Sequence, residues 1–185
     1  LPLIGAYQAA NALVSAGLVL ATGGYARPLP VPGADLDGVH VLRTMADVNA
    51  IRARIVPGLR AAIVGAGYIG LECAATLRKL GLEVTVIETL ELPLLSVLGR
   101  EVAEIFAALH RDHGVDLRFR AQVQEITGHD GRVAGVRLAD GGHVDAEAVV
   151  VGVGITPNTE LADAAGLGVD DGIVVDDHLR SSDAD

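Results

Sequence analysis

The sequence predicts an α/β protein with a Rossmann-like βαβ parallel sheet and an antiparallel β-meander crossover. Three observations indicate this fold. An apolar run at residues 60–64 is followed by a glycine turn and by a helical pattern that ends at Gly81. A second apolar run follows at 82–88, so the connection has the length that parallel pairing requires. From residue 116 onward the hydrophobic period becomes two and turn signals recur, which is typical of antiparallel strands.

Composition favours a globular chain and excludes several classes of partner. Of the 185 residues, 50% are hydrophobic and 21% are charged, which is enough apolar material for one full domain. The 14 Lys and Arg residues face 24 Asp and Glu residues, a formal net charge of −10. That balance argues against nucleic acid and against an anionic membrane as partners. The single cysteine, Cys73, and the lack of an evident signal peptide favour the cytoplasm.

Three segments precede the βαβ unit. Residues 1–17 are rich in Ala and Leu, and we expect a hydrophobic helix that ends at the last glycine of the segment. Residues 18–22 are a short apolar run that suits a buried strand. Residues 27–38 contain three prolines, so we expect an irregular connection between two lobes.

The remaining elements follow from capping and periodicity. Thr44 and Asp47 form a capping-box pair that predicts a helix extending to Val56. A helix over 69–80 follows the glycine turn, and apolar spacing predicts another over 99–113. The other expected elements are antiparallel strands within 116–138, a buried strand over 148–151, a short helix capped by Asn158 or Thr159, and a final strand over 172–176.

The glycine turn indicates a binding site. Gly65, Gly67 and Gly70 have the G-x-G-x-x-G spacing between an apolar strand and a helix. The first glycine permits the tight turn, the second lets a pyrophosphate approach the backbone, and the third lets helix and strand pack closely. The helix N-terminus then presents N–H groups and a positive dipole end to the phosphates. The alternative is a glycine turn that binds nothing. The predicted dinucleotide-binding residues here are Gly65, Ala66, Gly67, Tyr68, Ile69 and Gly70.

Glu88, at the end of the second strand, indicates which dinucleotide is bound. Its carboxylate can accept hydrogen bonds from the adenosine ribose hydroxyls. A 2′-phosphate would be repelled and would find no Lys or Arg within residues 89–93. We therefore predict NAD(H) rather than NADP(H). Two alternatives stay open, because Glu88 could be a solvated carboxylate and Arg100 could fold back toward it.

Other side chains give weaker indications. Glu72 lies in the first turns of the helix, where the dipole favours a carboxylate even without a ligand. Cys73 has no CxxC partner, so we expect a packing role. The scattered histidines indicate no metal site, and the sequence has neither a Tyr-x-x-x-Lys pair nor a nucleophile elbow. Gly152, Gly154 and Ile155 form a second glycine turn after a strand, and we expect it at the same crevice.

Several segments resemble the FAD-dependent pyridine-nucleotide reductases, in particular the ferredoxin and rubredoxin reductases of oxygenase systems. The resemblance covers 18–185 and rests on segments such as LVLATGG, VGAGYIGLECAATLRKLG, LHRDHGVDLRF and GVGITPNTELADAAGL. In that family NADH passes a hydride to FAD, which sends single electrons to a small iron–sulfur protein. The resemblance implies that Ile69, Glu72, Gly154 and Ile155 lie near the nicotinamide, and it implies a catalytic role for Glu72.

The resemblance also has implications for organisation. Family members carry a separate G-x-G-x-x-G for FAD, which this sequence does not contain, so we expect it to bind NADH without turnover. We interpret 18–35 as a remnant of the FAD lobe with a linker, 36–155 as the NAD(H)-binding domain and 156–185 as a return toward the FAD lobe. Residues 1–17 instead resemble a helix of Mur ligases, and we interpret them as an appended segment.

Several functions stay open. In the parent protein the partner would be ferredoxin or rubredoxin. The alternatives within the same enzyme class are an NADH oxidase and a lipoamide-dehydrogenase-like flavoenzyme. A non-catalytic NADH-sensing module is the alternative from a different class.

Overall fold

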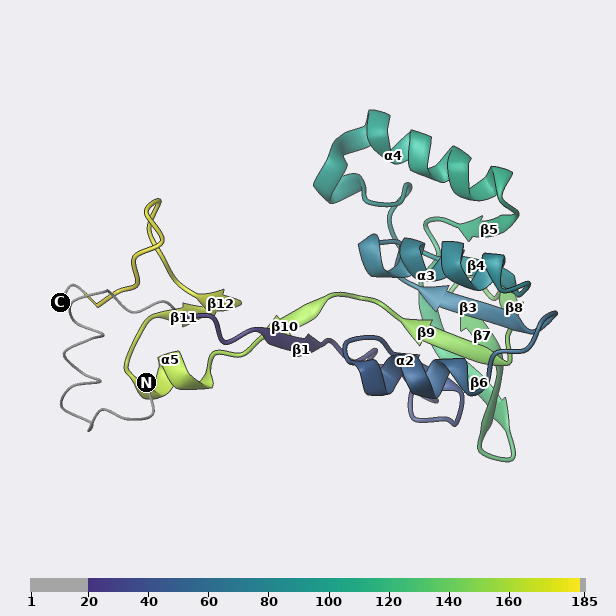
Figure 1. The fold of residues 1–185 in the computed structure, drawn as a ribbon, viewed down its shortest axis with the longest axis horizontal. Coiled ribbons are helices and arrows are strands. Elements are labelled where there is room, and N and C mark those ends of the chain that lie inside the picture. Colours follow the sequence, from purple (N-terminus) through teal and green to yellow (C-terminus); the bar gives the residue numbers. More distant parts are fainter. Residues whose placement is uncertain (1–19, 184–185) are drawn as a thin grey trace. The chain divides into compact units, whose positions relative to one another are not determined.

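The computed structural model describes residues 20–183 (Figure 1). The chain divides into two compact units, the larger of which is Tyr25–Ile155. The smaller unit comprises the residues on either side of it, up to Gly24 and from Thr156 onward. The helix predicted over 1–17 lies outside the described residues.

A five-stranded, fully parallel sheet forms the centre of the larger unit, in the order β2-β9-β3-β4-β5. The middle strand β3 is covered on both faces, which explains its continuous apolar sequence. Its residues alternate, with Ala61 and Ile63 in one buried cluster and Ala62 and Val64 in the other. The strands are β2 (Val39–Val41), β3 (Arg60–Val64), β4 (Glu83–Ile87), β5 (Val115–Arg118) and β9 (Ala148–Val151).

Helices pack against one face of this sheet. Leu71, Ala74 and Leu77 of α3 lie in the same buried cluster as Ile63 of β3, so β3, α3 and β4 form the predicted βαβ unit. The Thr44 capping box is present, but its helix ends four residues earlier than predicted. The helix predicted over 99–113 begins earlier, at Leu95. Gly99, with a φ of +74°, is a kink that joins two helical pieces within it. The helices are α2 (Met45–Arg52), α3 (Tyr68–Lys79) and α4 (Leu95–Asp112).

An antiparallel meander covers the opposite face. It is inserted between β5 and β9 (Figure 1). Its side chains form a buried cluster with Ala62, Val64, Val149 and Val151 of the parallel sheet. The predicted α/β fold with an antiparallel meander crossover is therefore confirmed. Its strands are β6 (Val123–His129), β7 (Arg132–Leu138) and β8 (His143–Asp145).

One strand assignment was wrong. The sequence pattern placed residues 116–119 in the meander, but β5 pairs in parallel with β4, with Ile87 opposite Arg118. The reason is that β5 is an edge strand of the parallel sheet and is partly exposed. A half-buried edge strand shows the same period-two pattern as a meander strand.

The smaller unit contains short elements. The helix α5 (Glu160–Ala164) follows Thr159, whose side chain makes no capping hydrogen bond. The strand predicted over 172–176 is only two residues long, as β12 (Gly172–Ile173), and it pairs antiparallel with β11 (Val169–Asp170).

One further sheet has two strands. Its strands are β1 (Gly24–Ala26) and β10 (Ile155–Pro157). The described part of the strand predicted over 18–22 is not part of a strand, and pairing begins only at β1. The segment 25–35 belongs to the larger unit, because Leu29 and Val31 pack against its meander-side core. No helix within residues 20–183 is long and apolar enough to cross a membrane.

Candidate functional site

The glycine turn between β3 and α3 requires glycine at two positions for steric reasons. Gly65 has a φ of +102°, and a Cβ there would lie 3.0 Å from the carbonyl carbon of Gly152. A Cβ on Gly70 would lie 3.1 Å from the carbonyl carbon of Gly65 and would collide with its oxygen. Because both obstacles are backbone atoms, they cannot rotate away. These two glycines therefore hold the loop tightly against the start of the helix and the end of β9.

The middle glycine of the turn faces open space. Gly67 is the N-cap of α3, with an extended backbone and no side-chain capping bond. A Cβ placed on Gly67 would have no atom within 4 Å. The first N–H groups of a helix have no intrahelical partner, so at this end they are available to a bound anion. Gly67 thus leaves open space in front of the helix N-terminus.

A groove of about 510 Å³ lies in the larger unit at the carboxyl ends of the parallel strands. This edge of an open parallel sheet is where ligands bind. Of the residues predicted from the sequence, the groove brings together Gly65, Gly67, Glu88, Gly152 and Gly154.

The other predicted residues do not line this groove. Ala66 is buried, while Tyr68 and Ile155 are exposed. Sequence reasoning missed two wall segments, Leu29–Val31 and Ala121–Val123. The second follows β5, so it would have been found if β5 had been assigned to the parallel sheet, whose carboxyl edge forms the site.

Glu88 is held firmly at the end of β4. Its Oε2 accepts a hydrogen bond of 2.7 Å from the N–H of Ala66 in the glycine turn. Its Oε1 accepts bonds of 3.0 Å each from the N–H of Leu90 and the hydroxyl of Thr89. A carboxylate offers about four acceptor positions, so these three bonds leave Oε2 able to accept one more. Glu88 is therefore fixed in the groove wall with capacity for a ligand hydroxyl.

Arg100 does not fold back toward Glu88. Its guanidinium pairs with Glu91, and a second nitrogen lies 3.9 Å from Glu104, one turn along α4. The structure therefore does not support the alternative in which Arg100 offsets the charge of Glu88.

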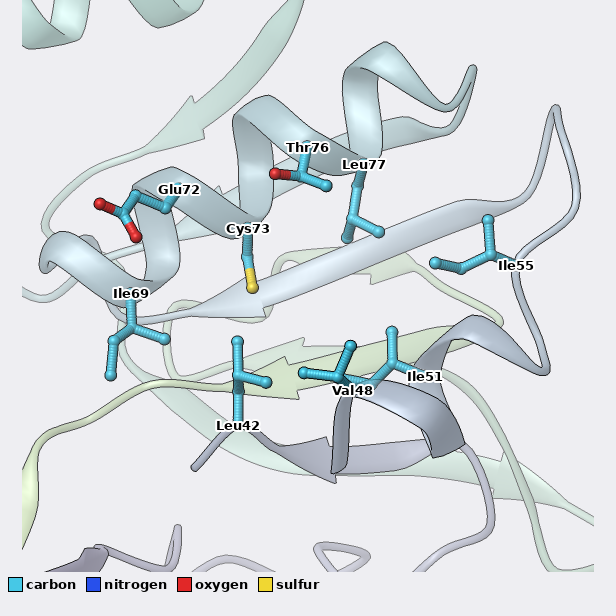
Figure 2. Close-up of a pocket in the computed structure, with 9 residues that line it drawn as sticks. All are labelled: Leu42, Val48, Ile51, Ile55, Ile69, Glu72, Cys73, Thr76 and Leu77. Atoms are coloured by element: carbon cyan, nitrogen blue, oxygen red, sulfur yellow. The ribbon is translucent and has the colours of Figure 1, made fainter. Parts of the chain in front are cut away.

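A second pocket, of about 270 Å³, lies between α2 and α3 (Figure 2). Figure 2 shows Glu72 and Ile69 at one end of it, and mainly aliphatic side chains with Cys73 and Thr76 along the rest. The structure thus places two residues predicted near the nicotinamide beside each other, but outside the lining of the glycine-turn groove. Cys73 also lines this pocket. Burial, and to a smaller extent the charge of Glu72, raise the pKa of its thiol, which fits the predicted packing role.

Within residues 20–183, no group of three His, Cys, Asp or Glu side chains is arranged to hold a metal ion. The site is therefore defined by a glycine turn, a helix N-terminus and a fixed carboxylate at the edge of a parallel sheet. Together with the fold, these features define a Rossmann-type domain.

The chain belongs to the pyridine nucleotide-disulphide oxidoreductase family, whose model matches residues 8–185. It is 46% identical over 166 residues to rhodocoxin reductase of Rhodococcus erythropolis, covering 90% of this chain and 39% of that protein. It is 42% identical over 171 residues to putidaredoxin reductase of Pseudomonas putida, covering 90% and 40%. The chain thus spans about two fifths of the length of these curated relatives.

The solved structures agree with the sequence relatives. A ferredoxin reductase from Rhodopseudomonas palustris superposes with a TM-score of 0.84 and 42% identity, covering 90% of this chain and 41% of that chain. The reductase in a covalent putidaredoxin reductase–putidaredoxin complex gives a TM-score of 0.83 and 41% identity, again covering 90% and 41%. The resemblance to ferredoxin and rubredoxin reductases is therefore confirmed. The family match begins within residues 1–17, the segment interpreted from the sequence as appended.

Proposed function

We propose that this chain is the NADH-binding domain of a flavoprotein reductase that delivers electrons to a ferredoxin-type iron–sulfur protein. The observation that carries the proposal is the groove, in which the two glycine turns and Glu88 meet at the carboxyl edge of the parallel sheet.

The residues of the groove divide the dinucleotide between them. The free N–H groups at the start of α3 hold the pyrophosphate, which Gly67 allows to approach closely. Glu88 accepts a hydrogen bond from an adenosine ribose hydroxyl. A hydrogen bond to a charged group contributes about 1.5–3 kcal/mol, and a 2′-phosphate would replace that gain with repulsion. This difference is the basis for the proposed preference for NADH over NADPH.

At the other end of the dinucleotide, we assign Ile69, Glu72, Gly154 and Ile155 to the nicotinamide half. A carboxylate such as Glu72 can accept a hydrogen bond from the carboxamide N–H₂ and so orient the ring. In the parent enzyme, FAD would accept the hydride and release electrons singly to ferredoxin or rubredoxin. Residues 20–183 hold no second glycine turn of this spacing that opens a helix, so no residue here is assigned to FAD.

The relatives favour a ferredoxin-type acceptor over the alternatives. Proteins named as ferredoxin or rhodocoxin reductases are 42–46% identical to this chain. The water-forming NADH oxidase of Lactobacillus brevis, bound to NADH, is 25% identical, with a TM-score of 0.76. An engineered form of that oxidase binds NADPH and carries five substitutions, among them an aspartate replaced by alanine and two that introduce arginine. Those changes fit the idea that acidic residues select NADH.

The test is a calorimetric titration of the purified chain with NADH and, under the same salt and protein concentration, with NADPH. We expect saturable binding that favours NADH. Glu88→Ala should weaken NADH binding and narrow the gap to NADPH. Glu83→Ala, an exposed carboxylate at the opposite end of β4, is the matched control and should behave as wild type. A folded chain that binds neither dinucleotide would contradict the proposal.

A second measurement separates binding from turnover. We expect the purified chain to carry no flavin absorbance and to leave NADH unoxidised when a ferredoxin acceptor is added. Steady NADH oxidation without added flavin would show that binding without turnover is the wrong description.

A further inference from the structure

Two arginines surround one carboxylate next to Glu88. Glu91 accepts a hydrogen bond of 2.5 Å from Arg120 on one oxygen and a hydrogen bond from Arg100 on the other. Arg100 belongs to α4 and Arg120 follows β5, so two separate elements bring positive charge to the same loop. Glu91 is thus the common partner of both guanidinium groups.

Backbone hydrogen bonds fix this cluster beside the groove. The N–H of Arg120 donates to the carbonyl of Leu90, and the N–H of Ala121 donates to the carbonyl of Glu88, both at 3.0 Å. Ala121 and Glu88 both line the groove. Arg120 is therefore one residue from the groove wall, at the end where the ribose would bind.

The side chains of the two arginines lie largely in solvent, whereas Glu91 is more confined. The side chains of Arg100 and Arg120 are 58% and 75% exposed, against 30% for Glu91. Long exposed arginine side chains adopt many rotamers, so what fixes these two guanidinium groups is their shared partner. Without Glu91, both would be able to turn toward another anion nearby.

We propose that Glu91 helps to select NADH by holding Arg100 and Arg120 away from the adenosine ribose; this inference rests on the proposed function. A phosphate monoester carries about −1.5 to −2 charges at neutral pH, and arginine is the side chain best suited to bind it. Glu88 repels a 2′-phosphate, and Glu91 occupies the cations that would otherwise compensate for that repulsion. Arg118, the residue paired with Ile87 at the same strand end, is engaged in the same way, by Asp116 at 2.8 Å.

The test uses a substitution that preserves size and removes charge. In wild type, the negative charges of Glu88 and Glu91 balance the positive charges of Arg100 and Arg120. Glu91→Gln removes one negative charge, so this group of four side chains gains one net positive charge. We expect the ratio of the NADPH to the NADH dissociation constant to fall about tenfold, which corresponds to about 1.4 kcal/mol. The NADH dissociation constant should stay within about twofold of the wild-type value, because NADH has no 2′-phosphate with which the freed arginines could pair.

A matched control distinguishes the specific effect from a change of net charge. Glu104→Gln changes the net charge equally but removes only the distant partner of Arg100 and leaves Glu91 in place. Its dissociation-constant ratio should equal that of wild type. Adding Arg100→Ala and Arg120→Ala to Glu91→Gln should restore the wild-type ratio. Raising the salt concentration should reduce the gain in NADPH affinity, since exposed charges are screened.

The outcomes distinguish this inference from the proposed function. If Glu91→Gln binds NADH normally and its ratio is unchanged, the role of Glu91 is refuted and the proposed function stands. If the folded wild-type chain binds neither dinucleotide, both are refuted. Glu91→Ala frees the same two arginines, so it must give the same shift should the glutamine variant fold poorly.

Discussion

Replacing Gly67 by Ala should weaken NADH binding at least about tenfold without destabilising the fold. The structure separates these two effects, because a Cβ on Gly67 meets no atom within 4 Å while the groove in front of it is where we place the pyrophosphate. The backbone of Gly67, with φ −77° and ψ −173°, is a conformation that alanine adopts without strain.

The stability change can be worked out from two opposing contributions. A Gly to Ala change at a compatible backbone position stabilises by about 0.4–1 kcal/mol through the entropy of the unfolded chain. Gly67 is also an N-cap, where alanine is less favourable than glycine by several tenths of a kcal/mol or more. These contributions nearly cancel, so the free energy of unfolding should change by less than about 0.5 kcal/mol.

The binding change should be much larger. A methyl group at residue 67 occupies the space through which the pyrophosphate approaches the helix N-terminus. Losing even one hydrogen bond between a charged phosphate and an N–H group costs about 1.5–3 kcal/mol. That loss corresponds to a rise in the NADH dissociation constant of at least about tenfold.

Urea unfolding and calorimetry on the same preparations provide the test. Gly70→Ala is the contrasting variant, because its Cβ would lie against the carbonyl group of Gly65. Overpacking of this kind costs about 1–3 kcal/mol, so Gly70→Ala should lower stability measurably. If Gly67→Ala is folded and binds NADH as wild type does, the placement of the pyrophosphate at α3 is wrong.

Four further predictions concern residues away from the groove. Thr44→Ala should cost about 1 kcal/mol at neutral pH in urea unfolding, because it breaks the capping box of α2. Backbone hydrogen bonds from Thr44 and Arg43 lower the pKa of Asp47, so its stabilising effect should be present above the ordinary value of 3.8 and lost as the pH falls below it; a pH series on Asp47→Asn checks the sign. Ile63→Ala, at a fully buried residue, should cost about 2–5 kcal/mol in thermal or urea unfolding. Because burial raises the pKa of the Cys73 thiol, its reaction with a disulfide reagent should have a midpoint at higher pH than free cysteine, and an unshifted profile would contradict the packing role.

Local patterns predicted the glycine turn and the elements on either side of it well. The strand predicted over 60–64 coincides with β3. The bounds of the helix predicted over 69–80 and of the strand predicted over 82–88 each differ from those of α3 and β4 by one residue at each end. The reason is that the glycine spacing, the helix period and the capping groups act between neighbours in the chain. Glu88 could be chosen as a candidate because its distance from the turn is a feature of the sequence.

The place of β5 could not be found in this way. Its four residues alternate as a meander strand would, and only their parallel pairing with β4, from Val84 opposite Val115 to Ile87 opposite Arg118, assigns β5 to the parallel sheet. That pairing determines which residues follow the strand at the carboxyl edge. As a result, Ala121 as a groove residue and Arg120 as a partner of Glu91 were both missed.

By itself, the sequence determined the class of fold, the glycine turn with its helix, and the acidic residue at the end of β4, because these depend on contacts between residues close in the chain. Only the tertiary structure decided what surrounds that acidic residue. It placed Arg100 and Arg120 on Glu91 rather than on Glu88, and it separated Glu72 from the glycine-turn groove. The physical reason is that ion pairs and groove walls depend on which distant elements pack together. When two charged partners lie far apart along the chain, the local sequence around one of them gives no sign of the other.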